Sequence, residues 1–430
     1  MQSITMRKVL WRLMPLLIII YLVAWLDRVN ISFAALQMNK ALGLSATAYG
    51  TGAGLFFLGY FLCEVPSNLM MVRFGARRWI ARIMVTWGII AGGSAFIQGE
   101  HSFYVMRVLL GLAEAGLFPG LVYYMMQWMP NEYRGRAVGL LMAASPFANV
   151  VGSPLSAALL GMDGIGGLGG WQWLLLLEAA PAIILAAVVL RWLPDNPGQA
   201  GWLAPAERDW LSTRLAQENA EREKQVKLSV GQVLLNPRVL LLAAVYYVIA
   251  AMVYTNGFWL PQIVKGFGLT NMQTGLLVAI PYLLGTIGCI IYGRWSDRDK
   301  GRDRSGYAIA SLCLAFVGAA IFVLASSPEM KMLGIVLGIL GQSTVQSVFW
   351  TLPASFLSGP AAAAGIAIIN SLGVMSGLST NWLMGAIKDA TGSYTGGFII
   401  SAGSILVAIG IILALRRGSP AAPVAANRPA

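Results

Sequence analysis

The residues with the clearest chemical potential are charged side chains inside an apolar segment near the N-terminus. Asp27 and Arg28 follow an uncharged run over residues 13–26, and Ser32 and Phe33 continue the segment beyond them. An ionisable residue inside a membrane-spanning helix is energetically costly, and by default it indicates a functional site. We therefore take this pair as the starting point for the chemistry of the chain.

Arg107 and Glu114, in a later apolar segment, are the predicted partners of this pair. They are seven residues apart, so they share one face of a helix. If the first segment enters the membrane from the cytoplasm, Asp27 lies ~22 Å deep in a hydrocarbon core that is ~30 Å thick. Counted from the opposite surface, Arg107 lies ~6 Å and Glu114 ~16 Å deep. Arg28 and Arg107 then share a depth. In the alternative interpretation, these residues form an ion pair whose only role is to hold the two segments together. Four charged residues are more than one such ion pair requires.

Two acids and two arginines suit the coupled movement of an anion and a proton. An arginine beside a carboxylate stabilises the ionised acid, whereas an arriving substrate carboxylate competes for that arginine and makes protonation of the acid easier. Substrate and proton then favour each other's binding. A guanidinium group also binds a carboxylate through two parallel hydrogen bonds and stays charged in a pocket.

The composition indicates a polytopic membrane protein. Of the 430 residues, 57% are hydrophobic and only 11% are charged, which no soluble core could absorb. The net charge of +12 does not indicate a nucleic-acid partner, because the basic residues lie between apolar segments. Cys63, Cys289 and Cys313 lack metal-type spacing, and His101 is the only histidine. We therefore expect no metal, no cofactor, no disulfide framework and no catalytic residues.

Twelve segments are long and apolar enough to span a membrane, so the predicted fold class is an all-α membrane protein. Basic residues cluster in alternate connections, which places both termini in the cytoplasm and suits a bacterial inner membrane. The predicted segments are approximately 12–34, 48–72, 78–98, 102–126, 137–160, 171–193, 238–263, 273–297, 306–325, 331–354, 360–385 and 394–415.

One long polar connection divides the chain into two pseudo-symmetric halves. Residues 1–193 form a predicted N-terminal six-helix bundle and residues 238–417 a C-terminal one. Residues 194–237 form the cytoplasmic linker, in which the charged stretch 207–227 is expected to hold amphipathic surface helices. Residues 418–430 are predicted to be a disordered tail.

With these features the chain resembles the major facilitator superfamily. The family signature after the second and eighth helices is a glycine, an aspartate four residues later, and then basic residues. After the eighth predicted segment the chain has all three parts, at Gly293, Asp297 and Arg298. After the second segment, Asn68 and Val72 stand in place of the glycine and the aspartate, and the basic part remains at Arg77 and Arg78. That departure loosens the usual cytoplasmic gate in the N-terminal half.

More narrowly, the chain is similar to the anion:cation symporter family, in the branch with carriers for phthalate, tartrate, hydroxyphenylacetate and sugar acids. The resemblance covers nearly the whole chain and depends on many short matches in order. They lie at residues 26–30, 64–68, 107–119, 171–173, 258–262, 273–277, 349–353 and 388–392.

The resemblance also implies roles for single residues. Asp27 and Glu114 correspond to the proton-carrying acids, and Arg28 and Arg107 to the arginines that bind the anion and couple it to the proton. The other implied pocket residues are Tyr60, Trp25, Ser145, Ser347, Trp350 and Asn370. Two of these depart from some sugar-acid carriers: Ser145 replaces a longer amide, and Trp25 replaces a tyrosine.

Some of these polar residues also have a structural interpretation. Ser347 and Trp350 belong to a stripe that either lines a cavity or makes hydrogen bonds between helices. We favour the cavity, because Asn370 in the next segment adds to it. Glu64 and Glu178 are interpreted as structural, since each lies beside a proline that frees backbone groups in need of partners.

These observations predict a proton-coupled importer of a small organic anion, working by alternating access. Two arginines against two acids suit a monocarboxylate or a small dicarboxylate, such as a sugar acid, tartrate or an aromatic acid, whereas a trianion would leave costly unpaired charge. The alternative is a facilitator or exporter of the same fold that uses a different ion. A membrane sensor or enzyme is disfavoured, because no sizeable soluble domain is present. We expect a monomer in the lipid bilayer.

Overall fold

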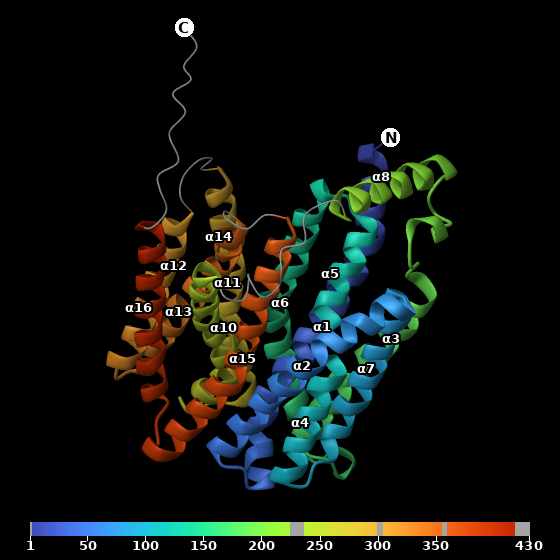
Figure 1. Ribbon diagram of the computed structural model, residues 1–430. Coiled ribbons are helices and arrows are strands. Elements are labelled where there is room, and N and C mark those ends of the chain that lie inside the picture. Colours follow the sequence, from blue (N-terminus) through green and yellow to red (C-terminus); the bar gives the residue numbers. More distant parts are fainter. Residues whose placement is uncertain (1, 224–235, 299–303, 355–358, 418–430) are drawn as a thin grey trace.

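A computed structural model describes residues 2–223, 236–298, 304–354 and 359–417. Within these ranges every regular element is an α-helix or a short 3₁₀ turn (Figure 1). The helices of the first part of the chain are α1 (Gln2–Leu42), α2 (Ala46–Phe74), α3 (Ala76–Gly93), α4 (Glu100–Glu114), α5 (Leu117–Trp128), α6 (Asn131–Leu159) and α7 (Gly170–Trp192). The later helices are α8 (Pro205–Glu223), α10 (Pro237–Lys265), α11 (Asn271–Arg298), α12 (Ser305–Leu324), α13 (Pro328–Phe349), α14 (Thr351–Ala354), α15 (Gly359–Thr391) and α16 (Thr395–Arg417).

Eleven spans among the described residues are long and apolar enough to cross a membrane. In a lipid core every backbone polar group must be satisfied internally, and a long apolar helix does this within one segment. The twelfth predicted segment, 360–385, falls within α15 and is not among the eleven. The fold is therefore an all-helical membrane fold, as predicted.

The helix that holds the first predicted span extends farther toward the N-terminus than the span itself. α1 begins at Gln2, ten residues before the predicted start near residue 12. The extra turns extend the helix toward α8, where the Lys8 ammonium group donates to the Glu207 carboxylate at 2.7 Å. This contact holds the pKa of Glu207 below its usual range. The predicted amphipathic helix in the linker corresponds to α8, and residues 224–227 lie outside the described residues.

Two spans that the sequence predicts as single helices are broken. The span predicted at 102–126 divides into α4 and α5, because Gly116 adopts a left-handed conformation with φ of 86°. The span predicted at 331–354 divides into α13 and α14 at Trp350. The two breaks fall in corresponding spans, the fourth after the N-terminus and the fourth after the linker.

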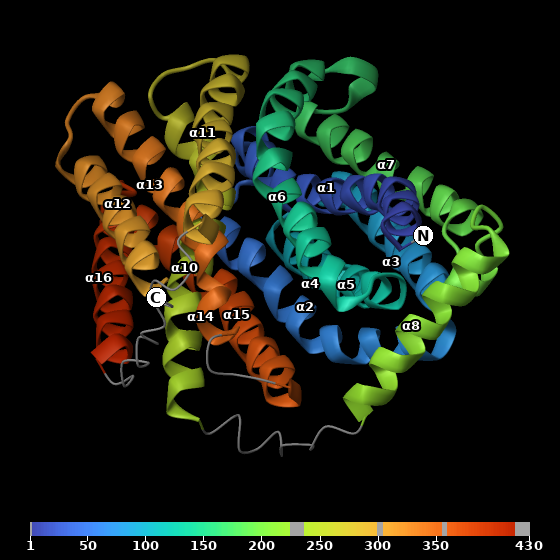
Figure 2. The same ribbon diagram turned by 90° about the horizontal axis from the view of Figure 1, so that it is seen from above.

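Figure 2 shows two groups of helices, α1 to α7 on one side and α10 to α16 on the other. α1 begins and α16 ends on the same side of the molecule (Figure 1). At the opposite side the groups are joined, because the backbone amides of Ala46 and Thr47 donate to the Asp389 carboxylate at 3.1 and 2.7 Å. A Cβ atom at Gly385 would lie 2.3 Å from the Ala46 carbonyl oxygen, so only glycine permits this approach of α15 to α2.

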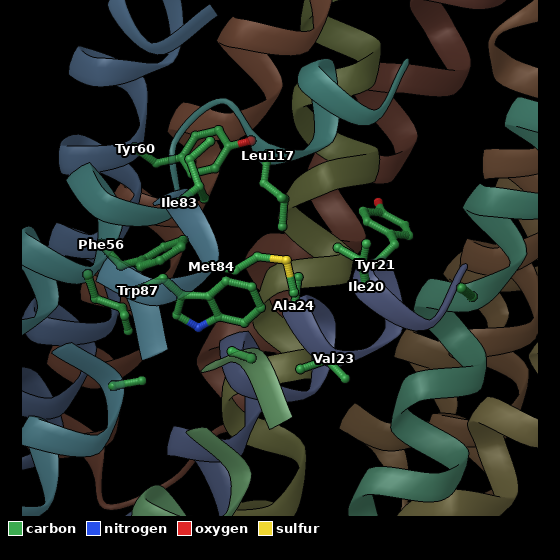
Figure 3. Packing of buried hydrophobic residues seen from close by; sticks show 14 of the residues in the cluster. Ile20, Tyr21, Val23, Ala24, Phe56, Tyr60, Ile83, Met84, Trp87 and Leu117 are labelled. Carbon is green, nitrogen blue, oxygen red and sulfur yellow. The ribbon is translucent and has the colours of Figure 1, made fainter. Parts of the chain in front are cut away.

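The first group packs around a large apolar cluster. Figure 3 shows part of it, with Phe56, Met84 and Trp87 from α2 and α3 facing Ile20 and Tyr21 of α1. Trp87 and Phe56 are fully buried. These bulky side chains exclude water from the segment of α1 that carries Asp27 and Arg28.

Candidate functional site

Arg28 and Glu114 form an ion pair between α1 and α4. The guanidinium Nη2 donates to the carboxylate Oε1, and Glu114 is fully buried. The Arg28 guanidinium carbon lies 5.2 Å from the ring centroids of Trp25, Phe56 and Tyr60. Aromatic faces attract a guanidinium group, so they hold this arginine in place in a site shielded from water.

Asp27 points in a different direction from its neighbour and is held by neutral donors. Its Oδ2 accepts a hydrogen bond from the Trp87 indole Nε1 at 2.5 Å, and its Oδ1 accepts one from Asn30 Nδ2 at 3.2 Å. Asp27 is 1% exposed. Asp27 and Arg107 line a small cavity with a volume of about 10 Å³. That volume is on the order of one water molecule.

Arg107 is a buried cation whose hydrogen-bonding capacity is largely unused. It is 2% exposed, and its Nε and Nη2 atoms are buried without a partner among the described residues. Its guanidinium carbon lies 4.9 Å from the ring centroid of Phe56 and 5.9 Å from that of Phe258. Aromatic faces compensate the charge only in part, so this guanidinium is suited to bind an anion.

The second helix group contributes aromatic residues of α10 to the same place. Tyr254 packs on Phe57 of α2 with ring centroids 4.3 Å apart. Phe258 faces Arg107. Arg28 and Arg107 therefore lie where α1, α2 and α4 meet α10, between the two groups, whereas Asp27 faces α3 inside the first group.

The break between α4 and α5 follows Glu114 directly. α4 ends at Glu114, and the left-handed Gly116 starts the next helix. A Cβ atom at Gly116 would lie 2.5 Å from the Ser67 hydroxyl of α2. Discontinuous helices are typical of the binding sites of membrane transporters, because freed backbone groups can face a ligand there.

The predicted pocket residues fall into two sets. Trp25 and Tyr60 are brought together with Arg28. Trp350, at the α13–α14 break, packs instead on Tyr246 of α10 with ring centroids 4.7 Å apart. This second set consists of Ser145, Ser347, Trp350 and Asn370. Among the described contacts, none joins the set to the four charged residues.

The remaining predicted residues belong to the gate motif. Gly293 lies in α11, which ends at Arg298, and the side chains of Asp297 and Arg298 lie outside the described residues. The Arg77 backbone amide donates to the Asp195 carboxylate at 2.9 Å, and Arg78 is exposed.

Asn30 and Trp87 hold Asp27 but were not identified as site residues from the sequence, and Glu178 has a partner that the sequence did not predict. Asn30 follows Asp27 by three residues, a spacing that places both on one helix face and could have indicated the contact. Trp87 carries no comparable signal, because any tryptophan in an apolar helix looks like packing. Glu178 was assigned to freed backbone beside Pro181. Its Oε1 instead accepts a hydrogen bond from Ser156 of α6 at 2.7 Å, and its buried Oε2 has no partner among the described residues.

A many-helix membrane fold with compensating charges buried between two helix groups is the arrangement of a secondary transporter. Among the described residues no group of His, Cys, Asp and Glu side chains has metal-binding geometry. The buried guanidinium and carboxylate groups are suited to bind and release ions and small polar molecules.

Comparison with known proteins identifies the family. The model of the Major Facilitator Superfamily matches residues 17–380, so the chain belongs to this superfamily of transporters and is not an enzyme. The chain is 46% identical to a protein of Agrobacterium vitis named "Putative tartrate transporter", over 98% of this chain and 93% of that one. It is 43% identical to the quinolone resistance transporter of Acinetobacter baumannii, over 95% and 93% of the two chains. The relative named for tartrate agrees with the predicted anion:cation symporter branch.

Solved structures confirm the fold. The inward-open xylose transporter XylE from E. coli superimposes with a TM-score of 0.76, covering 97% of this chain and 98% of that one at 15% sequence identity. At this identity the likeness concerns the fold alone.

Proposed function

We propose that this transporter takes up a small organic anion together with protons. The observation that carries the proposal is Arg107, a buried guanidinium with two nitrogen atoms that lack a partner among the described residues. Buried donor groups that lack a hydrogen-bond partner cost about 1–3 kcal/mol each, and a substrate carboxylate would remove that cost. The planar guanidinium group can bind both oxygens of one carboxylate.

The Arg28–Glu114 pair supplies the coupling in this proposal. When a substrate carboxylate competes for Arg28, Glu114 loses its counter-charge and binds a proton more readily. Asp27 is the second proton site, because neutral donors hold it beside Arg107. A carrier whose added negative charge is balanced by protons can reorient without carrying net charge through the membrane core.

Alternating access requires two halves that move about this site. We propose that residues 1–193 and 238–417 are these halves, that residues 194–237 link them, and that α15 completes a set of twelve spans. The termini lie in the cytoplasm of a bacterial cell, and the protein works as a monomer in the inner membrane. The contacts of Asp389 with α2 then close the outer side, and the described conformation faces inward.

The substrate is a monocarboxylate or a small dicarboxylate of the sugar-acid, tartrate or aromatic-acid kind. Support comes from the balance of Arg28 and Arg107 against two acids, from the aromatic walls, and from the relative named for tartrate. Ser145, Ser347 and Asn370 would add hydroxyl and amide groups when the halves close on the substrate.

A second candidate is export by the same fold, which the relative named "Quinolone resistance transporter" favours. Vesicles with an imposed pH gradient separate the two. We expect labelled tartrate or gluconate to accumulate when the outside is acidic, and unlabelled acids, but not glucose or a lipophilic cation, to compete. Accumulation of the labelled acid that does not depend on the pH gradient would contradict proton coupling. Competition by glucose or the cation, with none by any acid, would contradict the substrate class.

A further inference from the structure

Three arginines from three different helices converge on one cavity at the end of the molecule where α1 begins. Arg12 of α1, Arg77 of α3 and Arg191 of α7 line this cavity, whose volume is about 290 Å³. The volume lies near the lower end of the range for small-molecule sites. Figure 2 shows that α3, α7, α8 and the start of α1 lie together at the edge of the molecule farthest from α12 and α16. The cavity is therefore separate from the site between the two groups.

No acidic side chain lines this cavity among the described residues. The three guanidinium groups form no described ion pair, and the Arg77 Nε atom is buried without a hydrogen-bond partner. The Asp195 carboxylate accepts the Arg77 backbone amide at 2.9 Å, so one negative charge adjoins the cavity, against three guanidinium groups that line it. Cytoplasmic arginines in general follow from membrane topology. Three guanidinium groups that line one cavity repel one another, and a bound anion would relieve this repulsion.

The surroundings of the cavity match the level of the lipid headgroups. Trp192 lines it and is 66% exposed, and Trp11, next to Arg12, is 74% exposed. Exposed tryptophans near the ends of spanning segments favour the interface between membrane and water. Basic pockets between spanning helices on the cytoplasmic side are suited to anionic headgroups, and arginine binds phosphate oxygens in pairs.

We propose that this cavity binds a phosphate-bearing anion, through Arg12, Arg77 and Arg191. Two sources share this chemistry, the headgroup of an anionic phospholipid and a free phosphate in the cytoplasm. The proposal is independent of the transported substrate, because none of these arginines contacts the site at Arg28 and Glu114 in the described structure.

The test uses the purified full chain and two probes, dioleoyl-phosphatidylglycerol and inorganic phosphate, with dioleoyl-phosphatidylcholine as the neutral comparison. Bound lipid is measured by native mass spectrometry, and stabilisation by phosphate is measured as a shift in melting temperature. The variant is Arg12→Gln with Arg191→Gln. The control, Arg82→Gln with Arg417→Gln, removes the same charge from exposed arginines outside the cavity.

We expect the wild-type protein to bind phosphatidylglycerol in preference to phosphatidylcholine. The variant should bind it at least about tenfold more weakly, since two charge-assisted contacts are lost, and the control should be unchanged. Stabilisation by inorganic phosphate without a lipid preference, lost in the variant alone, would support the free-phosphate source. Binding of neither probe, or equal losses in variant and control, would overturn the proposal. If the double variant fails to fold, the single variant Arg191→Gln is measured in its place. It should bind the probe more weakly than the wild-type protein, and Arg191→Lys should restore binding.

Discussion

At the scale of single residues, the two arginines of the site differ in what surrounds them. Arg28 has a carboxylate partner in Glu114, whereas the Nε and Nη2 atoms of Arg107 have no partner in the described structure. An arginine with unpartnered nitrogen atoms is ready to bind substrate, and an arginine in an ion pair must exchange partners first. The first contact of the substrate carboxylate should therefore be with Arg107.

This difference predicts unequal effects of substitution by lysine. Arg107→Lys should weaken substrate binding at equilibrium by about tenfold or more, because a point ammonium group cannot reproduce the planar pair of donors. Arg28→Lys should weaken binding less and should impair coupling to the proton. Isothermal titration with purified protein gives the dissociation constants, with Arg82→Lys as a control on an exposed arginine of α3. Unchanged binding in both site variants would show that the anion binds elsewhere.

The two acids should control accumulation without being needed for every step. Asp27→Asn and Glu114→Gln should abolish accumulation driven by a pH gradient, because an amide binds no proton at neutral pH. Exchange of labelled for unlabelled substrate should survive in at least one variant, since an amide resembles the protonated acid. Glu329→Gln, at the exposed start of α13, is the matched control. Accumulation at the wild-type level in both variants would exclude these acids as proton sites.

At the scale of elements, broken helices and close helix contacts define where the site can open. The α4–α5 break follows Glu114, and the α13–α14 break lies at Trp350 in the corresponding span. A rearrangement at either break would change the direction of the adjoining side chain without unfolding a complete span. At the end of the molecule away from the termini, α15 contacts α2 at Gly385 with no room for a side chain.

Gly385→Leu should therefore separate these two helices. A leucine Cβ would lie within 2.3 Å of the Ala46 carbonyl oxygen, so α15 must move away from α2. Overpacking of about 1–3 kcal/mol shifts a two-state equilibrium by roughly fivefold or more. Spin labels at Lys40 and Thr391 should report longer distances than in the parent protein. Gly403→Leu, where the structure leaves open space, should not change the distances. An identical distance distribution in Gly385→Leu would contradict this contact as the closure.

At the scale of the whole molecule, the orientation in the membrane is open to a direct test. A reporter that is active only in the cytoplasm, fused after Ala430, should be active. A cysteine in place of His101, at the exposed start of α4, should react with a thiol reagent that cannot cross the membrane. Both results follow from the basic residues that cluster in alternate connections. A silent but well-expressed fusion would contradict the proposed orientation.

The sequence by itself determined the fold class, the family and the identity of the charged residues. Spanning helices can be predicted because lipid requires every backbone group to be satisfied within an apolar segment, which leaves a long uninterrupted signal. Asp27, Arg28, Arg107 and Glu114 could be predicted as partners because charge is rare and costly in such segments.

Only the tertiary structure decided how these residues are paired. Arg28, not Arg107, forms the ion pair with Glu114, and Trp87 and Asn30 hold Asp27. Which side chains form pairs depends on how the helices rotate and cross. Bulky and small residues set this rotation and crossing, but their pattern along the sequence does not reveal which helix they contact. The hydrogen bond from Ser156 to Glu178 and the convergence of Arg12, Arg77 and Arg191 have the same cause, since each brings together side chains of different helices.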